Sequence, residues 1–170
     1  MFNLHPERQQ FMSQPKPIKR SKELAPLSRE HHDGLLLCWK IRTGFARQIE
    51  EERIVNYVQH FYNTDLKPHF QKEEDYLFVL LPATDSLRTE AVGQHRELEG
   101  LIGLMNNGLA HIALSNFADL LERHIRFEER DLFPHFESVT DTLKLQAVSE
   151  QIDSKEKQCE MDWNDKFWIK

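Results

Sequence analysis

The sequence predicts an all-α protein, an antiparallel up-down four-helix bundle with an N-terminal arm and a C-terminal helical extension. Apolar residues recur at helical spacing in four long segments. Period-two alternation and paired hairpin turn residues are absent, which argues against strands. Proline, glycine and asparagine separate the helical segments. At 170 residues the chain is long enough for a single domain with a real core.

Three parts of the chain are expected to differ in organisation. Residues 1–23 are rich in proline and basic side chains, which predicts an irregular arm. Residues 24–137 carry the four long periodic segments and form the predicted bundle. Residues 138–170 are predicted to add a shorter helix, from about Asp141 to Cys159, and a tail that packs on the bundle through Trp163, Phe167 and Trp168.

The first long helix is predicted to start near Ser28, a plausible N-cap, and to end near Glu50 or Ile54. Its apolar stripe consists of Leu35, Cys38, Ile41, Phe45 and Ile49. Extending this stripe towards the N-terminus reaches His31. The neighbouring His32 lies about 100° away around the helix and remains the rival candidate.

The second long helix is predicted over about Glu51 to Leu80, with a stripe of Tyr62, Leu66, His69, Glu73, Leu77 and Leu80. Pro68 lies inside it, directly before His69. Because proline lacks an amide proton, we expect a kink or a restarted helix there.

The third helix is predicted from Asp85 to Asn106 and places His95 on its apolar stripe. The fourth begins near Ala110 or Leu114 and reaches Phe133, where Pro134 is expected to kink or end it. Its stripe is Phe117, Leu121, His124 and Glu128.

A ten-residue motif occurs twice, at residues 69–78 and 124–133. Both copies read His-apolar-x-x-Glu-Glu-x-x-Leu-Phe. Positions i and i+4 share one face of a helix, so each histidine lies above the first glutamate of its motif, in line with buried leucines. A buried imidazole or carboxylate is costly unless it is paired or binds a metal. The doubled motif therefore indicates a metal site inside the bundle.

Each long helix contributes to this predicted site, which comprises four histidines and two glutamates: His31, His69, Glu73, His95, His124 and Glu128. A single tetrahedral zinc would need only four ligands, and calcium or magnesium would prefer oxygen. Six nitrogen and oxygen ligands suit two first-row transition ions, each with two histidines, bridged by the glutamates. Ligand softness and geometry favour iron, with manganese as the nearest competitor and zinc still open.

The order of these residues resembles the hemerythrin-like domain of the bacterial His-His-Glu cation-binding class. The Leu27-Ser28-Arg29-Glu30-His31-His32, Lys67-Pro68-His69-Phe70 and Leu132-Phe133-Pro134 segments are also typical of that family. The resemblance covers residues 24–137. It implies a non-haem di-iron centre with an oxo or hydroxo bridge and at least one coordination position open to a small molecule.

One position departs from the family pattern. Oxygen-carrying hemerythrins place a second histidine four residues after the first on the third helix, where this chain has Glu99. Glu99 could be an additional ligand, a partner that orients His95, or a solvated side chain. The substitution favours sensing, iron handling or redox chemistry over simple oxygen carriage. We expect Glu74 and Glu129 to be solvated, His60 to lie on the surface and Cys38 to be inert packing.

Composition limits the partners. The formal net charge of −6 argues against nucleic acid or an anionic membrane. Two distant cysteines and the absence of a signal-peptide core or long apolar run predict a cytoplasmic protein, with a homodimer left open. The predicted function is binding or sensing of O2 or NO, or iron handling. The alternatives are a di-iron enzyme that reduces NO or peroxide or repairs iron centres, and a structural zinc or metal-free bundle.

Overall fold

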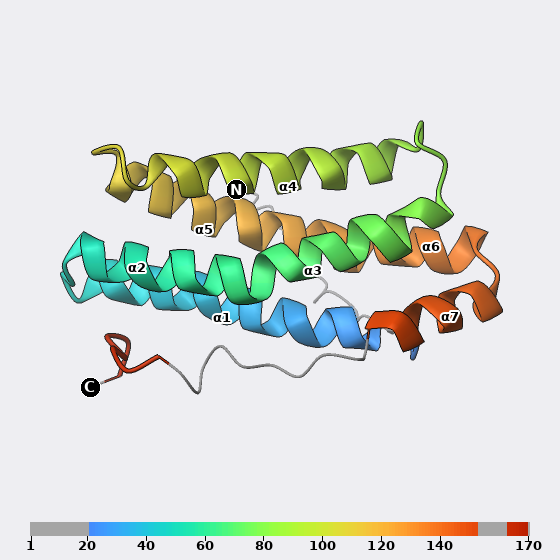
Figure 1. The fold of residues 1–170 in the computed structure, drawn as a ribbon, viewed down its shortest axis with the longest axis horizontal. Helices are drawn as coiled ribbons and strands as arrows, with labels where there is room; N and C mark the ends of the chain where they lie inside the picture. Colours follow the sequence, from blue (N-terminus) through green and yellow to red (C-terminus); the bar gives the residue numbers. More distant parts are fainter. Residues whose placement is uncertain (1–20, 153–162, 170) are drawn as a thin grey trace, which may run out of the picture.

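The computed structural model describes residues 21–152 and 163–169, and these residues form helices without any strand. The helices form four long rods that run in alternating directions (Figure 1). The first rod is α1 (Ala25–Ala46), and the second consists of α2 (Glu51–Phe61), η1 (Tyr62–Leu66), α3 (Lys67–Lys72), η2 (Glu73–Leu77) and η3 (Phe78–Leu80). The third rod is α4 (Ser86–Leu104), and the fourth consists of α5 (Ala110–Phe127), η4 (Glu128–Leu132) and α6 (Phe133–Val139). The appended helix is α7 (Thr142–Ile152). The predicted helical bundle is confirmed.

The first rod differs from its predicted bounds at both ends. It begins at Ala25 rather than Ser28, with Pro26 in the first turn, where a missing amide proton costs nothing. It ends at Ala46, before either predicted terminus, because Gln48 adopts a left-handed backbone conformation with φ of 55°. The third rod starts as predicted, since the Asp85 side chain accepts hydrogen bonds from two amides of the first turn.

The two internal prolines follow widened, π-helical turns. Pro68 lies at the start of α3 directly after η1, and the ribbon bends where α2 passes into α3 (Figure 1). Pro134 lies at the start of α6 directly after η4, so the helix continues to Val139 instead of ending. A π turn accommodates a proline because it shifts the backbone hydrogen bonds that the ring would otherwise break.

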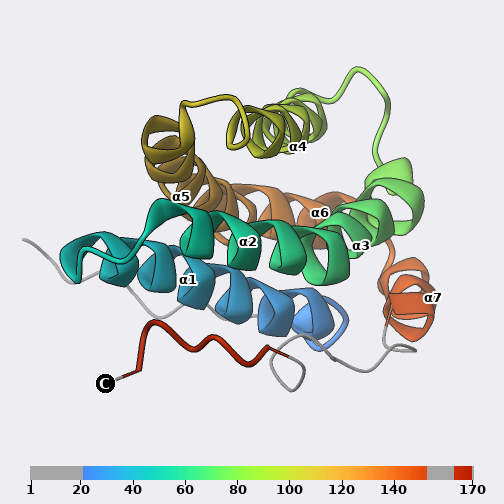
Figure 2. The same ribbon diagram turned by 60° about the vertical axis from the view of Figure 1, so that its left-hand side comes forward.

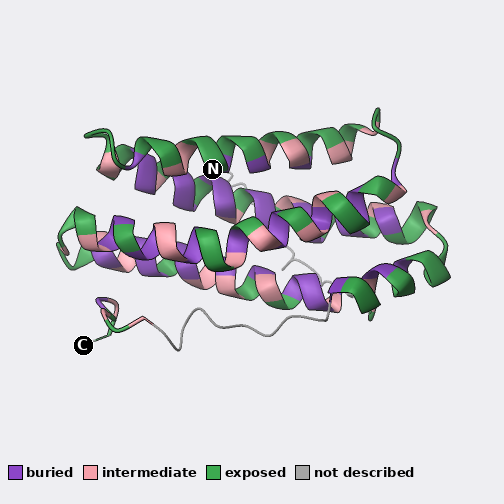
Figure 3. Cartoon of the chain, viewed as in Figure 1, coloured by how far each residue is buried: buried purple, intermediate pink, exposed green. Residues whose placement is uncertain are grey.

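Buried residues lie where the rods face one another (Figure 3). The buried apolar side chains form two clusters. The first cluster includes Leu37, Tyr57, Leu98, Phe117 and Leu121. The second cluster includes Leu27, Phe78, Ala91, Leu132 and Phe136, together with three residues of α7. Along α1, α4 and α5–η4 the predicted site histidines fall between residues of one cluster and residues of the other. The folded bundle therefore has a polar layer, formed by the site residues, between the two apolar clusters.

The C-terminal segment 163–169 lies along the outer side of α1 (Figure 2). Phe167 is buried in the first cluster, and Arg53 makes two hydrogen bonds of 2.9 and 2.6 Å to the Asp165 carboxylate. Tyr57 contacts three aromatic rings of this segment, those of Trp163, Phe167 and Trp168. None of the described helices combines the length and apolarity that crossing a bilayer demands.

Candidate metal centre

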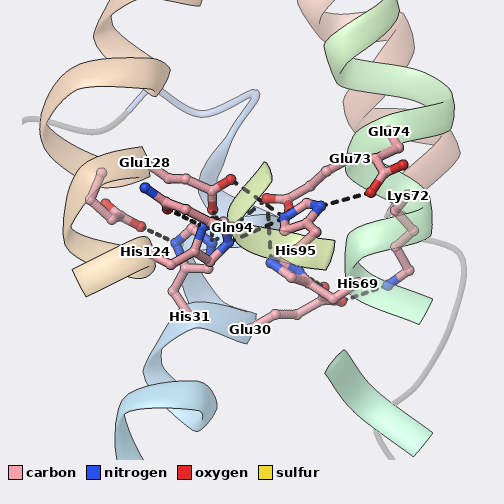
Figure 4. A network of polar contacts seen from close by, with 11 residues as sticks. Glu30, His31, His69, Lys72, Glu73, Glu74, Gln94, His95, His124 and Glu128 are labelled. Carbon is pink, nitrogen blue, oxygen red and sulfur yellow. Dashed lines mark hydrogen bonds and ion pairs between the residues drawn. The ribbon is translucent and has the colours of Figure 1, made fainter. Parts of the chain in front are cut away.

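Six side chains from all four rods meet in the polar layer of the bundle (Figure 4). They are the six predicted from the sequence: His31, His69, Glu73, His95, His124 and Glu128. All six are buried, and Glu73, His95, His124 and Glu128 have no exposed surface. His32, the rival of His31, is exposed on the outer face of α1. The structure thus brings the predicted residues together; that they bind metal remains a prediction.

The four imidazoles share one hydrogen-bonding arrangement. Each directs Nε2 inward and donates from Nδ1 to an oxygen on a neighbouring helix. The four pairs are His31 with Glu129 at 2.8 Å, His69 with Glu30 at 2.7 Å, His95 with Glu74 at 2.8 Å, and His124 with Gln94 at 2.9 Å. A proton held on Nδ1 leaves the Nε2 lone pair free for a metal, and the hydrogen bond fixes the plane of the ring.

These acceptors are themselves held in place. Lys72 donates to the second oxygen of Glu30 at 2.6 Å, and Arg96 donates to the second oxygen of Glu74. Gln94 donates its amide proton to Glu90 at 3.0 Å, which turns the amide oxygen towards His124. The imidazoles are therefore oriented by a second layer of residues before any metal arrives, which lowers the cost of binding.

Glu73 and Glu128 lie between the two pairs of histidines. Glu73 Oε1 is 3.3 Å from His69 Nε2, and Oε2 is 3.4 Å from His95 Nε2. Glu128 Oε2 lies 3.0 Å from His31 Nε2 and 3.4 Å from His124 Nε2. Both glutamates consequently belong to two overlapping candidate sites, one with His31 and His69 and one with His95 and His124. Such sharing is the geometry of carboxylates that bridge two metal ions.

The inward-facing atoms lack ordinary hydrogen-bond partners. All four carboxylate oxygens of Glu73 and Glu128, and Nε2 of His31, are buried without one, although His31 Nε2 approaches Glu128 closely. Nε2 of His95 faces Nε2 of His124 at 3.2 Å, yet both rings donate from Nδ1. Buried electron pairs pointing at one another require a cation or extra protons between them. The donor set therefore fits a pair of metal ions.

Without a metal, the pKa values of the site histidines reflect the same need for positive charge beside the buried carboxylates. Burial opposes a proton on His31, but the carboxylates of Glu128, Glu129 and Glu73 outweigh it and hold the pKa well above its usual value. The same balance raises the pKa of His95 to about 9. Burial and the neighbouring His95 lower the pKa of His124 well below its usual value. Protons on some imidazoles thus compensate the buried carboxylates.

Aromatic rings enclose the imidazoles. Phe70 stacks on His95 with ring centroids 4.0 Å apart, and Phe78 stacks on the same histidine at 5.7 Å. Phe133 stacks on His31 at 5.3 Å. These apolar walls restrict water around the inward-facing atoms, so charges placed there interact strongly.

Two expectations about the doubled motif were wrong. Neither glutamate is a free solvated side chain: Glu129 is buried, Glu74 is only partly exposed, and each accepts a hydrogen bond from the lone histidine of another rod. In both copies the π-helical turn begins at the first glutamate, so the assumed α-helical phase does not continue through the pair. The repetition of Glu-Glu in both copies was the signal for these partners. Glu30 and Gln94 were missed, although each directly precedes a lone histidine.

The other candidates lie away from the cluster. Glu99 is exposed and belongs to neither candidate site, which agrees with its reading as a solvated side chain. His60 is partly buried rather than on the surface, with its ring against Trp163. Cys38 is buried in the first apolar cluster, as expected for packing.

A family model for the hemerythrin HHE cation-binding domain matches residues 24–136, most of the chain and all six residues of the cluster. The chain belongs to the hemerythrin HHE cation-binding family. No curated protein sequence and no solved structure matches it. For this hemerythrin-type bundle, the family assignment and the buried histidine–glutamate cluster agree on cation binding.

Proposed function

We propose that this hemerythrin-type protein holds two iron ions at the shared cluster and binds or senses O2 or a related diatomic such as NO. The observation that carries the proposal is the division of six ligands into two overlapping sites that share Glu73 and Glu128. Two histidines and the two shared carboxylates would hold each ion, which makes four protein ligands for each. Iron commonly takes more, which leaves coordination positions for a small molecule.

Side chains around the cluster fix the orientation of the imidazoles and restrict the access of water to them. The oxygens of Glu129, Glu30, Glu74 and Gln94 keep the Nδ1 protons in place and the Nε2 lone pairs inward. The phenylalanine walls restrict water, which favours an apolar diatomic over bulk solvent. When bound, the ions would supply the electrons and the open coordination positions, and the protein would control access to them.

The deciding experiment joins metal quantitation to optical spectra of the full chain. We expect two irons per chain after expression with iron supplied, and spectra that differ between air and anaerobic reduction. A reversible adduct of the reduced protein with O2 or NO would support binding or sensing, whereas repeated turnover would support the enzymatic alternative. One zinc per chain, or no metal in a metal-replete preparation, would refute the di-iron proposal.

A further inference from the structure

A polar pocket lies between the second rod and α4. One wall belongs to η1, α3 and η2, and the other belongs to the part of α4 that carries His95 and Arg96. Glu74 bridges the two walls, because it accepts a hydrogen bond from His95 (Figure 4) and another from Arg96. The pocket has a volume of about 290 Å³. This volume suits a small metabolite, since drug-sized ligands generally occupy about 300 to 1,000 Å³.

Tyr62 brings a hydroxyl group without a partner to this pocket. The side chain is 6% exposed, and its hydroxyl makes no hydrogen bond to any residue that the structure describes. Burial and the nearby Glu99 carboxylate raise the pKa of the Tyr62 phenol, so the hydroxyl keeps its proton at neutral pH. A mostly buried hydroxyl that the protein leaves unpaired is stabilised when a ligand accepts its hydrogen bond.

Unpaired charges of both signs line the same pocket. Lys67, Asp75 and Glu99 are all part of its lining, and none of the three forms an ion pair with another residue in the described part of the chain. The guanidinium of Arg96 adds a second positive charge, and it has N–H groups beyond the one that it donates to Glu74. An ion of one sign would meet like charges as well as opposite ones here. A ligand that carries both signs can satisfy both.

The inner wall of the pocket is aromatic. Phe70 lines it and stacks on His95, with ring centroids 4.0 Å apart. Both ring nitrogens of His95 are directed away from the pocket: Nδ1 donates to Glu74, and Nε2 lies 3.4 Å from Glu73 inside the cluster. An occupant would therefore pack its carbon atoms against aromatic rings and would not reach the metal-facing nitrogen.

We propose that this pocket binds a small zwitterion of the α-amino acid class. The ammonium group would donate to the Glu99 carboxylate, and the ligand carboxylate would accept hydrogen bonds from Tyr62 and Arg96, with Lys67 adding positive charge. The side chain of the amino acid would lie against Phe70. This inference goes beyond the proposed function, and it requires no metal ion.

Isothermal titration calorimetry of the full chain, with each standard L-α-amino acid as the probe, tests the proposal. We expect at least one of them to bind saturably, with one site per chain. The amine that lacks its carboxylate and the acid that lacks its ammonium group should each bind at least about 10-fold more weakly, since each loses a charge-assisted interaction. Absence of saturable binding by every amino acid, or equal binding of either analogue, would overturn the proposal.

Two nearly isosteric variants locate the site. Tyr62→Phe removes only the hydroxyl and should weaken binding of the same amino acid by about 3- to 10-fold. Glu99→Gln removes the charge that faces the ammonium group and should weaken it by about 10-fold or more. Iron content should be the same in both variants as in the unaltered chain, because neither residue belongs to the buried cluster.

Each variant has a matched control outside the pocket lining. Tyr76→Phe removes the hydroxyl of a tyrosine on η2 that is 40% exposed, and Glu97→Gln removes a charge from an exposed position of α4. Both controls should bind the amino acid with unaltered affinity. Unaltered affinity in Tyr62→Phe and Glu99→Gln as well would show that the amino acid binds elsewhere, and it would overturn the assignment to this pocket.

Discussion

Nδ1 of His31 on α1 lies 2.8 Å from Oε1 of Glu129 on η4, almost a hundred residues further along the chain. This contact ties the first rod to the last and orients the only site histidine of α1. It also explains why Glu129, which directly follows the buried Glu128, is buried as well.

The first prediction concerns this contact. Glu129→Ala should lower metal affinity by about 10- to 100-fold, because His31 loses the acceptor that fixes its ring. Glu129→Gln keeps an acceptor oxygen and should lose less. Competition with a chelator of known affinity measures both, and Asp131→Ala, at an exposed neighbour, is the control. Equal affinity in Glu129→Ala and the control would contradict the assigned role.

The second prediction separates shared from unshared ligands. Glu128→Ala should remove both ions, since its carboxylate belongs to both candidate sites, whereas His124→Ala should remove only the ion at the His95–His124 position. Elemental analysis of the purified variants measures the stoichiometry. His60→Ala changes a histidine outside both sites and should retain full metal. Full iron in Glu128→Ala would disprove the bridging assignment.

The third prediction is a dependence of metal binding on pH. In the metal-free chain the raised pKa of His95, about 9, keeps this imidazole protonated at neutral pH, and the pKa of His31 is raised as well. A metal must displace these protons, so affinity should rise as pH increases towards about 9. Calorimetry in buffers of different ionisation enthalpy should detect protons released at pH 7 and fewer at pH 10. Release that stays constant over this interval would count against the prediction.

The fourth prediction concerns the C-terminal segment. Phe167 is 4% exposed and packs against Tyr57, so Phe167→Ala should lower the free energy of unfolding by about 3 kcal/mol. Ile169 is 59% exposed, and Ile169→Ala should cost little. Urea denaturation followed by tryptophan fluorescence gives both values. Metal content should stay unchanged, because Gly44, which Phe167 contacts, lies about 20 Å along α1 from His31.

The fifth prediction concerns Cys38. Burial raises the pKa of its thiol to about 12, so almost no thiolate exists at pH 8. In a Cys159→Ser background, the folded protein should react with iodoacetamide far more slowly than the same protein in denaturant. Mass spectrometry over time measures the adduct. Comparable rates in the folded and denatured protein would show that the thiol is accessible and ionised.

Helical periodicity was sufficient to predict the rods and the six converging side chains. The stripe of α1 selected His31 over His32 because a buried face repeats reliably along a regular helix. The same rule failed at Glu74 and Glu129, since periodicity assumes α-helical geometry and both motifs enter a π turn at their first glutamate. The ends of α1 were missed because they depend on single backbone conformations, at Pro26 and Gln48.

The hydrogen-bond partners of the site histidines could not be predicted from the spacing of residues in the sequence. Glu30 meets His69, and Gln94 meets His124, across helix pairs whose relative height and rotation are set by packing. A sequence pattern defines the faces of one helix and leaves the vertical offset between two helices undetermined. The six converging side chains were predictable because each lies on the apolar stripe of its helix, whereas their hydrogen-bond partners lie at the edges of those stripes.

The π-helical turns η2 and η4 also make the packing of the later residues depend on the number of residues in each turn. Each turn accommodates more residues than an α turn, and the chain beyond it is phased accordingly. Removing one residue from η4 would rotate every later side chain by about 100°, carrying Phe133 and Phe136 out of the second apolar cluster. A shortened chain could retain every histidine and glutamate of the centre and still lose the wall that closes it.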